Sequence, residues 1–253
     1  MSFKVVIPAR YGSTRLPAKA LLEIGGRPMV QWVIAAASMS RAGEVLVATD
    51  DERVAQIALD PQQRNVAVMT RADHQSGTDR IAEVAAQRGW TDRTVVVNVQ
   101  GDEPQLPAAL IDQVAALLEQ HADADLATLC TPVTSLHEFL DPNVVKVVTA
   151  LGKQALYFSR APIPWHRDGA PQGLASQTSI LGAQRHLGIY AYRVKALREL
   201  TTLSPSDLEV TEKLEQLRAL QAGMRIVVGV ASQPPGIGVD TEQDLERVRA
   251  QLS

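Results

Sequence analysis

The sequence predicts an α/β protein in which a doubly wound, mostly parallel sheet carries a smaller β-rich insertion. Two observations lead to this prediction. Short apolar runs alternate with helical patterns up to residue 132, which is typical of βαβ units and a parallel sheet. Beyond Pro132 the rhythm changes, because strand-like runs at 144–150 and 155–159 follow each other closely, as paired strands do. The chain therefore divides into an α/β part over residues 1–132, an insertion over 133–205 and a return to the α/β core over 206–253.

The first half of the chain is expected to alternate strands and helices with recognisable starts. Helices are expected to begin at Pro28 and Pro107, because proline is tolerated in the first helical turn, where its missing N–H needs no partner. Thr49 and Glu52 have capping-box spacing, and Asp50 and Asp51 between them are expected to cap the helix, with ligand contact as the alternative. Thr78 is the expected N-cap of the next helix. The expected strands are 3–7, 45–48, 66–69, 95–99 and 126–132, and the expected helices are 28–43, 52–59, 78–87 and one that starts at 107.

The second half is expected to contain a long loop before regular structure returns. The stretch 167–184 has little apolar content and is predicted to be exposed. Ser206 and Glu209 have capping-box spacing for a helix over 204–220. Strands are expected at 186–193 and 225–230, and the chain closes with a helix.

Composition excludes several classes of protein. The formal net charge is −3 and the pI about 6.0, so no overall field favours nucleic acid or an anionic membrane, and neither is expected as a partner. No apolar run approaches the roughly 18 residues of a membrane span. The single cysteine, Cys130, cannot form an internal disulfide, which favours a cytoplasmic location. The histidines lack metal-ligand spacing, and His74 is expected to be a surface-loop residue.

The first candidate site is a cationic loop that follows the first strand. Arg10, Arg15 and Lys19 are spaced through it with no acidic residue among them, and small residues occupy 12–14. Glycine lets backbone N–H groups approach an anion and arginine binds phosphate oxygens in pairs, so the pattern is typical of a polyphosphate site. The spacing of a Walker A motif is absent. The alternative is a solvated basic loop without a ligand.

The second candidate site is acidic. Asp102 follows the apolar run 95–99, at the carboxyl end of a strand, where open α/β sheets bind ligands. It is the first candidate ligand for Mg²⁺, which uses one or two protein carboxylates together with phosphate oxygens and water. Asp240, in a Gly-rich turn before the last helix, is the candidate second ligand, and Glu103 is a weaker substitute. The alternative for this turn is that Asp240 or Thr241 caps the final helix.

A set of motifs occurs in order over nearly the whole chain. They are RYGSTRLPAK (10–19), HQSGTDR (74–80), NVQGDEP (98–104), YFSRAPIPW (157–165), RHLGIYAYR (185–193), EKLEQLR (212–218) and GVDTEQDLERVR (238–249). Together they resemble the 3-deoxy-manno-octulosonate cytidylyltransferases, or CMP-Kdo synthetases, which have a nucleotidyltransferase-like fold. The early RxxSxRLPxK pattern is shared with other sugar nucleotidyltransferases, whereas HQSGTDR, RHLGIYAYR and EKLEQLR together are specific to this family. Ala18 and Ala20 depart from it, since Gly and Pro are more frequent there.

The resemblance implies a reaction and the residues that perform it. The family joins CTP to the acidic sugar 3-deoxy-manno-octulosonate (Kdo), releases pyrophosphate, requires Mg²⁺ and works as a homodimer. The α/β part is then the nucleotide-binding part, and the insertion serves sugar binding and the dimer contact. The implied catalytic residues are Arg10, Lys19, Asp102 and Asp240, the last two as metal ligands. The implied nucleotide-binding residues are Ala9, Arg10, Ser13, Lys19, Arg71, Ser76 and Gln100. The implied sugar-binding residues are Arg160, His186, Tyr190, Glu212, Glu215 and Gln216.

The implied product, CMP-Kdo, serves lipopolysaccharide assembly. Two alternatives stay open at the level of the sequence. The acceptor could be a related acidic sugar such as sialic acid or 8-amino-Kdo, or the chain could be a non-catalytic nucleotide-binding module on the same fold. The presence of both Asp102 and Asp240 favours an enzyme over such a module.

Overall fold

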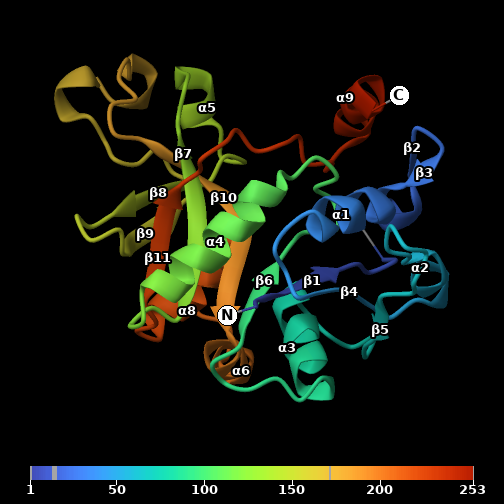
Figure 1. Cartoon of the computed structure of the whole chain (residues 1–253). Helices are drawn as coiled ribbons and strands as arrows, with labels where there is room; N and C mark the ends of the chain where they lie inside the picture. The colour runs from blue at the N-terminus through green and yellow to red at the C-terminus, as the bar shows by residue number, and fades with distance from the viewer. Residues whose placement is uncertain (1, 13–15, 171, 253) are drawn as a thin grey trace.

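A nine-stranded sheet forms the centre of the molecule (Figure 1). The structure, a computed structural model, describes residues 2–12, 16–170 and 172–252. In this part of the chain the strand order is β11-β7-β10-β6-β1-β4-β5, and β8 pairs with both β10 and β9. The strands are β1 (Lys4–Pro8), β4 (Glu44–Thr49), β5 (Ala67–Met69), β6 (Val95–Asn98), β7 (Leu126–Pro132), β8 (Lys146–Thr149), β9 (Ala155–Ser159), β10 (Gln184–Arg193) and β11 (Ile226–Val230), with a separate small pair β2 (Glu23–Ile24) and β3 (Arg27–Pro28).

Helices occupy most of the connections between these strands. The α-helices are α1 (Met29–Ser38), α2 (Glu52–Ile57), α3 (Gly77–Gln87), α4 (Ala108–Gln120), α5 (Leu136–Leu140), α6 (Val194–Thr202), α7 (Asp207–Glu212), α8 (Gln216–Gln221) and α9 (Glu242–Leu252). Short 3₁₀ turns are η1 (Lys19–Leu21), η2 (Arg167–Gly169) and η3 (Leu174–Ser176).

The sheet is mostly parallel, as the alternation of strands and helices predicts. β1 is parallel to β4 and β6, and β7 is parallel to β11, whereas β10 is antiparallel to β6, β7 and β8. Tyr190 of β10 lies opposite Asn98 at the end of β6, and Arg193 lies opposite Val95 at its start. The beginning of β10 therefore lies at the edge of the sheet where the parallel strands end.

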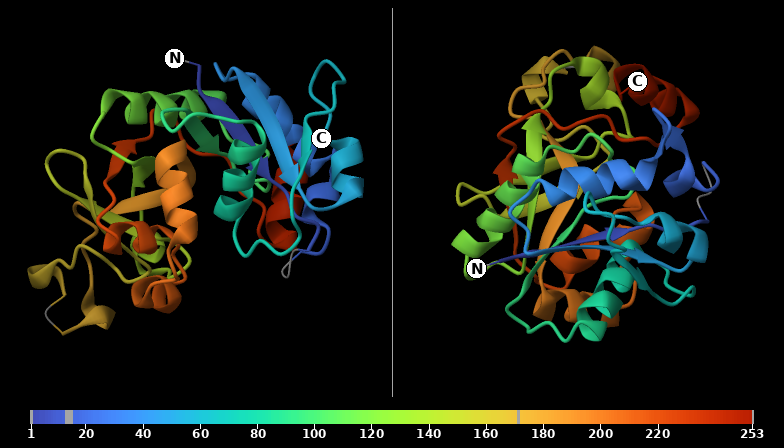
Figure 2. Two further views of the ribbon diagram at one scale, coloured as in Figure 1. Left: turned by 90° about the horizontal axis from the view of Figure 1, so that it is seen from below. Right: turned by 45° about the vertical axis from the view of Figure 1, so that its right-hand side comes forward.

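Helices cover both faces of the sheet, which confirms the doubly wound fold (Figure 2). Side chains alternate along β1 because successive residues of a strand point to opposite faces. Val5 and Ile7 pack in one core with α1 and α4, and Val6 packs in a second core with α3, α6 and α8. The central strands are buried on both faces, which explains their nearly continuous apolar sequences.

The C-terminal helix returns to the N-terminal part of the molecule. Leu245 and Val248 of α9 pack with Ile24, Met29 and Val239 in a separate small core. In both figures α9 lies beside β2, β3 and the start of α1. This packing brings the turn that precedes α9 next to the loops at the carboxyl ends of β1 and β6.

The predicted insertion is continuous with the central sheet. Its strand β10 lies between β6 and β7, and the β8–β9 hairpin pairs with the first residues of β10. Between β9 and β10 the chain extends away from the sheet, as the gold segment in both figures shows. The division at residues 133 and 205 stays a prediction.

One helix cap agrees with prediction and two differ. Asp51 caps α2, as expected for one of the two aspartates, because its carboxylate accepts the Arg53 N–H at 2.9 Å, and Thr49 is not the cap. Ser76, not Thr78, caps α3 in a capping box with Asp79. Thr78 is the second residue of the helix and is buried.

Three helical regions also differ from prediction. The helix predicted over 204–220 is two helices, because Lys213 adopts a left-handed conformation (φ 54°) that ends α7, although the Ser206–Glu209 capping box is present as predicted. Helix α6 was not predicted, and α1 ends at Ser38 instead of near Gly43. Among the described residues, no helix combines the length and apolar character needed to cross a bilayer.

Candidate active site

A cavity of about 420 Å³ opens at the carboxyl ends of β1 and β6. Four segments form its walls: the loop after β1, the β5–α3 loop with the first turns of α3, the loop after β6, and the α7–α8 turn at Glu215. Gly101 allows the first and third segments to approach, since a Cβ there would lie 2.8 Å from the Pro8 carbonyl oxygen. The cavity therefore lies where an open α/β sheet is expected to bind its ligand.

One lysine and two aspartates meet at the edge of this cavity. Lys19 Nζ lies 2.8 Å from Asp102 Oδ2 and 3.1 Å from Asp240 Oδ1. The three residues come from η1, the loop after β6 and the turn before α9, and the Val239 N–H donates to the Asp102 carbonyl at 2.8 Å. A backbone hydrogen bond thus holds the two aspartate segments together.

In the turn before α9, one residue caps the helix and another faces the candidate metal site. Thr241 caps the helix, because its hydroxyl accepts the Asp244 N–H at 3.2 Å while Asp244 Oδ2 accepts the Thr241 N–H at 3.0 Å. The Asp240 carboxylate instead faces Lys19. The two distant aspartates therefore converge as expected.

Glu103 lies close to this pair. Burial, followed by the negative charges of Asp102 and Asp240, raises the pKa of Glu103 to about 7. Among the described residues, no group of three or more His, Cys, Asp or Glu side chains is arranged to hold a metal ion. A divalent ion here would have to complete its coordination with ligand oxygens or water.

A second, smaller cavity of about 200 Å³ adjoins the first. It is lined by side chains of β10 and of the α7–α8 turn, including His186, Tyr190 and Gln216. The two cavities share the following lining residues: Thr78, Asn98, Gln100 and Glu215. They therefore form one continuous site with two compartments, and these shared residues mark the boundary.

His186 is neutral in the second cavity. Burial lowers the pKa of its imidazole to about 3. The Thr128 hydroxyl lies 3.0 Å from His186 Nε2, 3.1 Å from the Leu187 carbonyl and 2.8 Å from the Ile189 carbonyl, and it has one hydrogen to donate among them.

Several polar atoms around the second cavity are enclosed without a protein partner. Within the described residues, Asn98 Oδ1, the Tyr190 hydroxyl and Gln216 Nε2 are buried and make no hydrogen bond. Burial also raises the pKa of Glu215 above its usual value. Unsatisfied buried polar groups cost free energy, and they are common where a polar ligand completes the structure.

Comparisons with known proteins agree with this architecture. The cytidylyltransferase family pattern matches residues 4–226. The 3-deoxy-manno-octulosonate cytidylyltransferase of Thioalkalivibrio sulfidiphilus is 54% identical over 252 residues, covering 100% of this chain and 99% of the relative. The enzyme of the same name from Pseudomonas fluorescens is 51% identical and covers 99% of this chain and 98% of the relative. The chain belongs to the 3-deoxy-manno-octulosonate cytidylyltransferase family.

A solved structure supports the same assignment at the level of the fold. CMP:2-keto-3-deoxy-manno-octonic acid synthetase complexed with CTP superimposes with a TM-score of 0.85 at 41% identity, covering 99% of this chain and 98% of that chain. The family resemblance and the nucleotidyltransferase-like fold are thereby confirmed. As a member of this family, the chain is a nucleotidyltransferase.

Most residues that the family resemblance implies lie in the two cavities. Ala9, Arg10, Lys19, Ser76, Gln100 and Asp102 line the first cavity, and His186, Tyr190, Glu215 and Gln216 line the second. Asp240 lines neither cavity itself, but its carboxylate contacts Lys19, which lines the first. Ser13 lies outside the described residues.

Besides Asp240, three implied residues of the described chain do not line either cavity. The Arg71 side chain is largely exposed and forms an ion pair with Asp73. Arg160 and Glu212 bind each other, since Arg160 Nε donates to the Glu212 carbonyl at 2.6 Å and the Arg160 N–H donates to Glu212 Oε2 at 2.9 Å. Glu212 also accepts the Ser159 hydroxyl at 2.6 Å. Their predicted roles in nucleotide and sugar binding stay predictions.

Sequence reasoning missed other lining residues: His74, Thr78, Arg80, Asn98 and Tyr192. Two of them carried a usable signal. Asn98 is a polar residue inside an apolar strand, and Tyr192 shares a strand face with Tyr190 because it is two positions further along. His74 was expected on the surface, but its side chain is only 15% exposed because it contacts Glu83.

Proposed function

We propose that the chain transfers the cytidylyl group of CTP to Kdo, releasing pyrophosphate and forming CMP-Kdo for lipopolysaccharide biosynthesis. The observation that carries this proposal is the pair of adjoining cavities with different chemistry. The first has cations and a carboxylate at its edge, as a nucleoside triphosphate requires, and the second has neutral hydrogen-bonding groups enclosed with apolar side chains, as a polyhydroxylated sugar requires. The solved relative was complexed with CTP, and the curated relatives are named for Kdo.

Mg²⁺ is the proposed metal, and the donor set fits it. Asp102 and Asp240 supply two carboxylates, and triphosphate oxygens with water would supply the remaining ligands. When bound, the ion polarises phosphoryl oxygens and neutralises their charge. Arg10 and Lys19 line the same cavity, so their charges can offset those that accumulate on the departing pyrophosphate.

The second cavity orients the acceptor. The neutral His186 imidazole, the Tyr190 hydroxyl and the Gln216 amide provide hydrogen-bonding groups of both kinds without a fixed positive charge. Since Asn98 and Glu215 line both cavities, they lie where the two substrates would meet. Placing the reactants side by side removes much of the entropic cost of a two-substrate reaction.

The test is pyrophosphate release from CTP and Mg²⁺ with different acceptors. Kdo is expected to support rapid release, whereas sialic acid and a mixture without acceptor are expected to give little. A faster reaction with sialic acid or 8-amino-Kdo would reassign the acceptor. CTP binding without release for any acceptor would favour a non-catalytic nucleotide-binding module.

We also propose a cytoplasmic homodimer whose contact involves the insertion. Large apolar side chains of this region are exposed, including Leu151, Leu156 and Leu181. An interface between two copies of the chain would remove these side chains from water, which is favourable. The location follows from CTP as substrate and from the free, buried Cys130. Light scattering should give twice the mass of the chain, and Leu156→Lys should lower that value; a monomer in the wild-type chain would contradict the proposal.

A further inference from the structure

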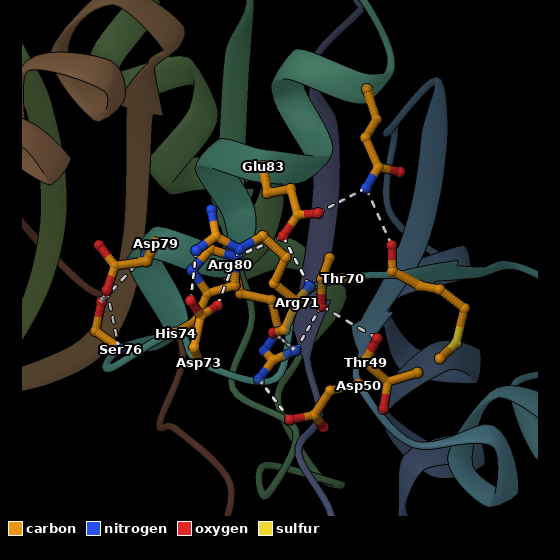
Figure 3. A network of polar contacts seen from close by, with 12 residues as sticks. Thr49, Asp50, Thr70, Arg71, Asp73, His74, Ser76, Asp79, Arg80 and Glu83 are labelled. Carbon is orange, nitrogen blue, oxygen red and sulfur yellow. Dashed lines mark hydrogen bonds and ion pairs between the residues drawn. The ribbon is translucent and has the colours of Figure 1, made fainter.

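One face of helix α3 holds the β5–α3 loop in place (Figure 3). Arg80, Glu83 and Gln87 are three and four positions apart, which places them on the same side of a helix. Each of them reaches back to residues 69–74, which precede the helix. The same loop continues into His74, Gln75 and Ser76, which line the first cavity.

Glu83 is the centre of these contacts. Its Oε2 accepts the Arg71 N–H at 2.9 Å and contacts His74 Nε2, and its Oε1 accepts Gln87 Nε2 at 2.9 Å. Gln87 Nε2 in turn donates to the Met69 carbonyl at 3.0 Å. Burial alone would raise the pKa of Glu83, but the Arg71 N–H and the His74 contact outweigh it and the pKa is lowered. An ionised acceptor therefore holds both the backbone and a side chain of the loop.

Arg80 secures the start of the same loop. Its guanidinium binds Asp50 Oδ2 at 3.0 Å, donates to the Thr70 hydroxyl and approaches the Arg71 carbonyl at 3.3 Å. Unlike Glu83, Arg80 lines the first cavity. A substitution of Arg80 would therefore change ligand contacts as well as the loop, whereas Glu83 acts on the loop alone.

We propose that Glu83 is a positioning residue for the nucleotide: it fixes the loop at Arg71 and His74 so that residues 74–76 are already arranged to receive CTP. This inference rests on the proposed function, which places the nucleotide in the first cavity. Binding to an ordered loop avoids the entropic cost of ordering it on association. Because residues 74–76 do not line the second cavity, sugar affinity does not depend on Glu83.

The experiment compares Glu83→Gln with a matched control in the full-length chain. Glu199→Gln is the control, because Glu199 is a helix-surface glutamate in an exposed ion pair with Lys195 on α6 and lines neither site cavity. In Glu83→Gln, the KM and calorimetric Kd for CTP should rise about tenfold, since one ordering step is added to binding. The kcat at saturating CTP and the KM for Kdo should stay within about twofold of wild type, and all values for the control should be unchanged.

Hydrogen exchange supplies a second measurement. Amides of residues 70–76 should exchange faster in Glu83→Gln and regain protection when CTP binds. If that variant does not fold, Gln87→Ala removes the supporting contact from an exposed position, and it should raise the Kd for CTP about two- to threefold with the same exchange pattern.

Different failures have different meanings. CTP affinity unchanged in these variants, or equal rises in both KM values, would overturn the positioning role and leave the proposed function intact. A wild-type chain that does not bind CTP would overturn the proposed function and this inference with it.

Discussion

Replacing Lys19 by methionine should make the proposed metal site accessible in the absence of nucleotide. The Lys19 ammonium lies within hydrogen-bonding distance of both Asp102 and Asp240. A divalent ion bound by the two carboxylates must displace it from both contacts. Methionine has a similar length and no charge, so Lys19→Met leaves the carboxylate pair without this competing cation.

The size of the effect follows from distance and exposure. Charge-assisted hydrogen bonds contribute about 1.5–3 kcal/mol each when enclosed and less than about 1 kcal/mol when exposed. Asp102 is 31% and Asp240 50% exposed, at 2.8 and 3.1 Å from Nζ. We therefore assign about 2 kcal/mol to the two contacts together, which corresponds to an approximately 30-fold change in metal affinity.

The assay is a Mn²⁺ titration followed by electron paramagnetic resonance, with and without CTP. Without nucleotide, Lys19→Met should bind Mn²⁺ about 30-fold more tightly than wild type. With CTP the difference should shrink, because the triphosphate competes for the ammonium and draws it from the carboxylates. Lys195→Met, at an exposed ion pair on α6, is the control and should match wild type. Equal Mn²⁺ affinities of Lys19→Met and wild type without nucleotide would refute the reasoning.

The other predictions concern turnover, sugar affinity and stability. Asp102→Asn and Asp240→Asn should each lose about 10²–10³-fold in kcat with an unchanged circular dichroism spectrum, and near-normal turnover at saturating Mg²⁺ would contradict the role of that residue. Tyr190→Phe should keep or raise the melting temperature, because it removes an enclosed hydroxyl without a partner among the described residues, while the KM for Kdo rises about tenfold; a lower melting temperature with an unchanged KM would contradict this. Glu209→Gln should lower the free energy of unfolding by about 1–2 kcal/mol at pH 7, since Glu209 forms an ion pair with Arg218 at 2.6 Å. Arg218 lowers the pKa of Glu209, so the stabilisation by this pair is present above the pKa of the unfolded state and is lost as pH falls through the pKa of the folded state. The melting temperatures of mutant and wild type should therefore converge well below pH 4. A difference in melting temperature that stays constant with pH would exclude the ion pair as the cause of the destabilisation.

The sheet and the convergence of Asp102 and Asp240 could be predicted because local patterns determine them. Strands buried on both faces appear as apolar runs such as 95–99, and parallel strands place their following polar residues at one edge. Asp102 was identified in this way. Asp240 could be paired with it because a turn beside a Gly-rich segment brings a carboxylate to the same edge, although the choice of Thr241 as the helix cap required the structure.

The remaining features depend on tertiary contacts that no local pattern encodes. Arg160 and Glu212 have side chains suited to an acidic, hydroxylated sugar, but the end of β9 meets the end of α7 and the two residues bind each other. The break at Lys213 lies inside a pattern that favours a single helix. β10 was expected within the β-rich insertion, and its alternating sequence does not reveal that it joins the central sheet.

The reversed direction of β10 has a consequence for how new specificities could arise. A parallel strand at this position would deliver its last residues to the ligand edge and then leave through a helix, whereas β10 arrives there with its first residues, directly from the segment that follows β9. Changes in length or sequence within that segment would consequently reshape the second cavity, the proposed acceptor site, without altering the strands that form the first. The topology leaves the recognition of one substrate free to diverge while the other is retained.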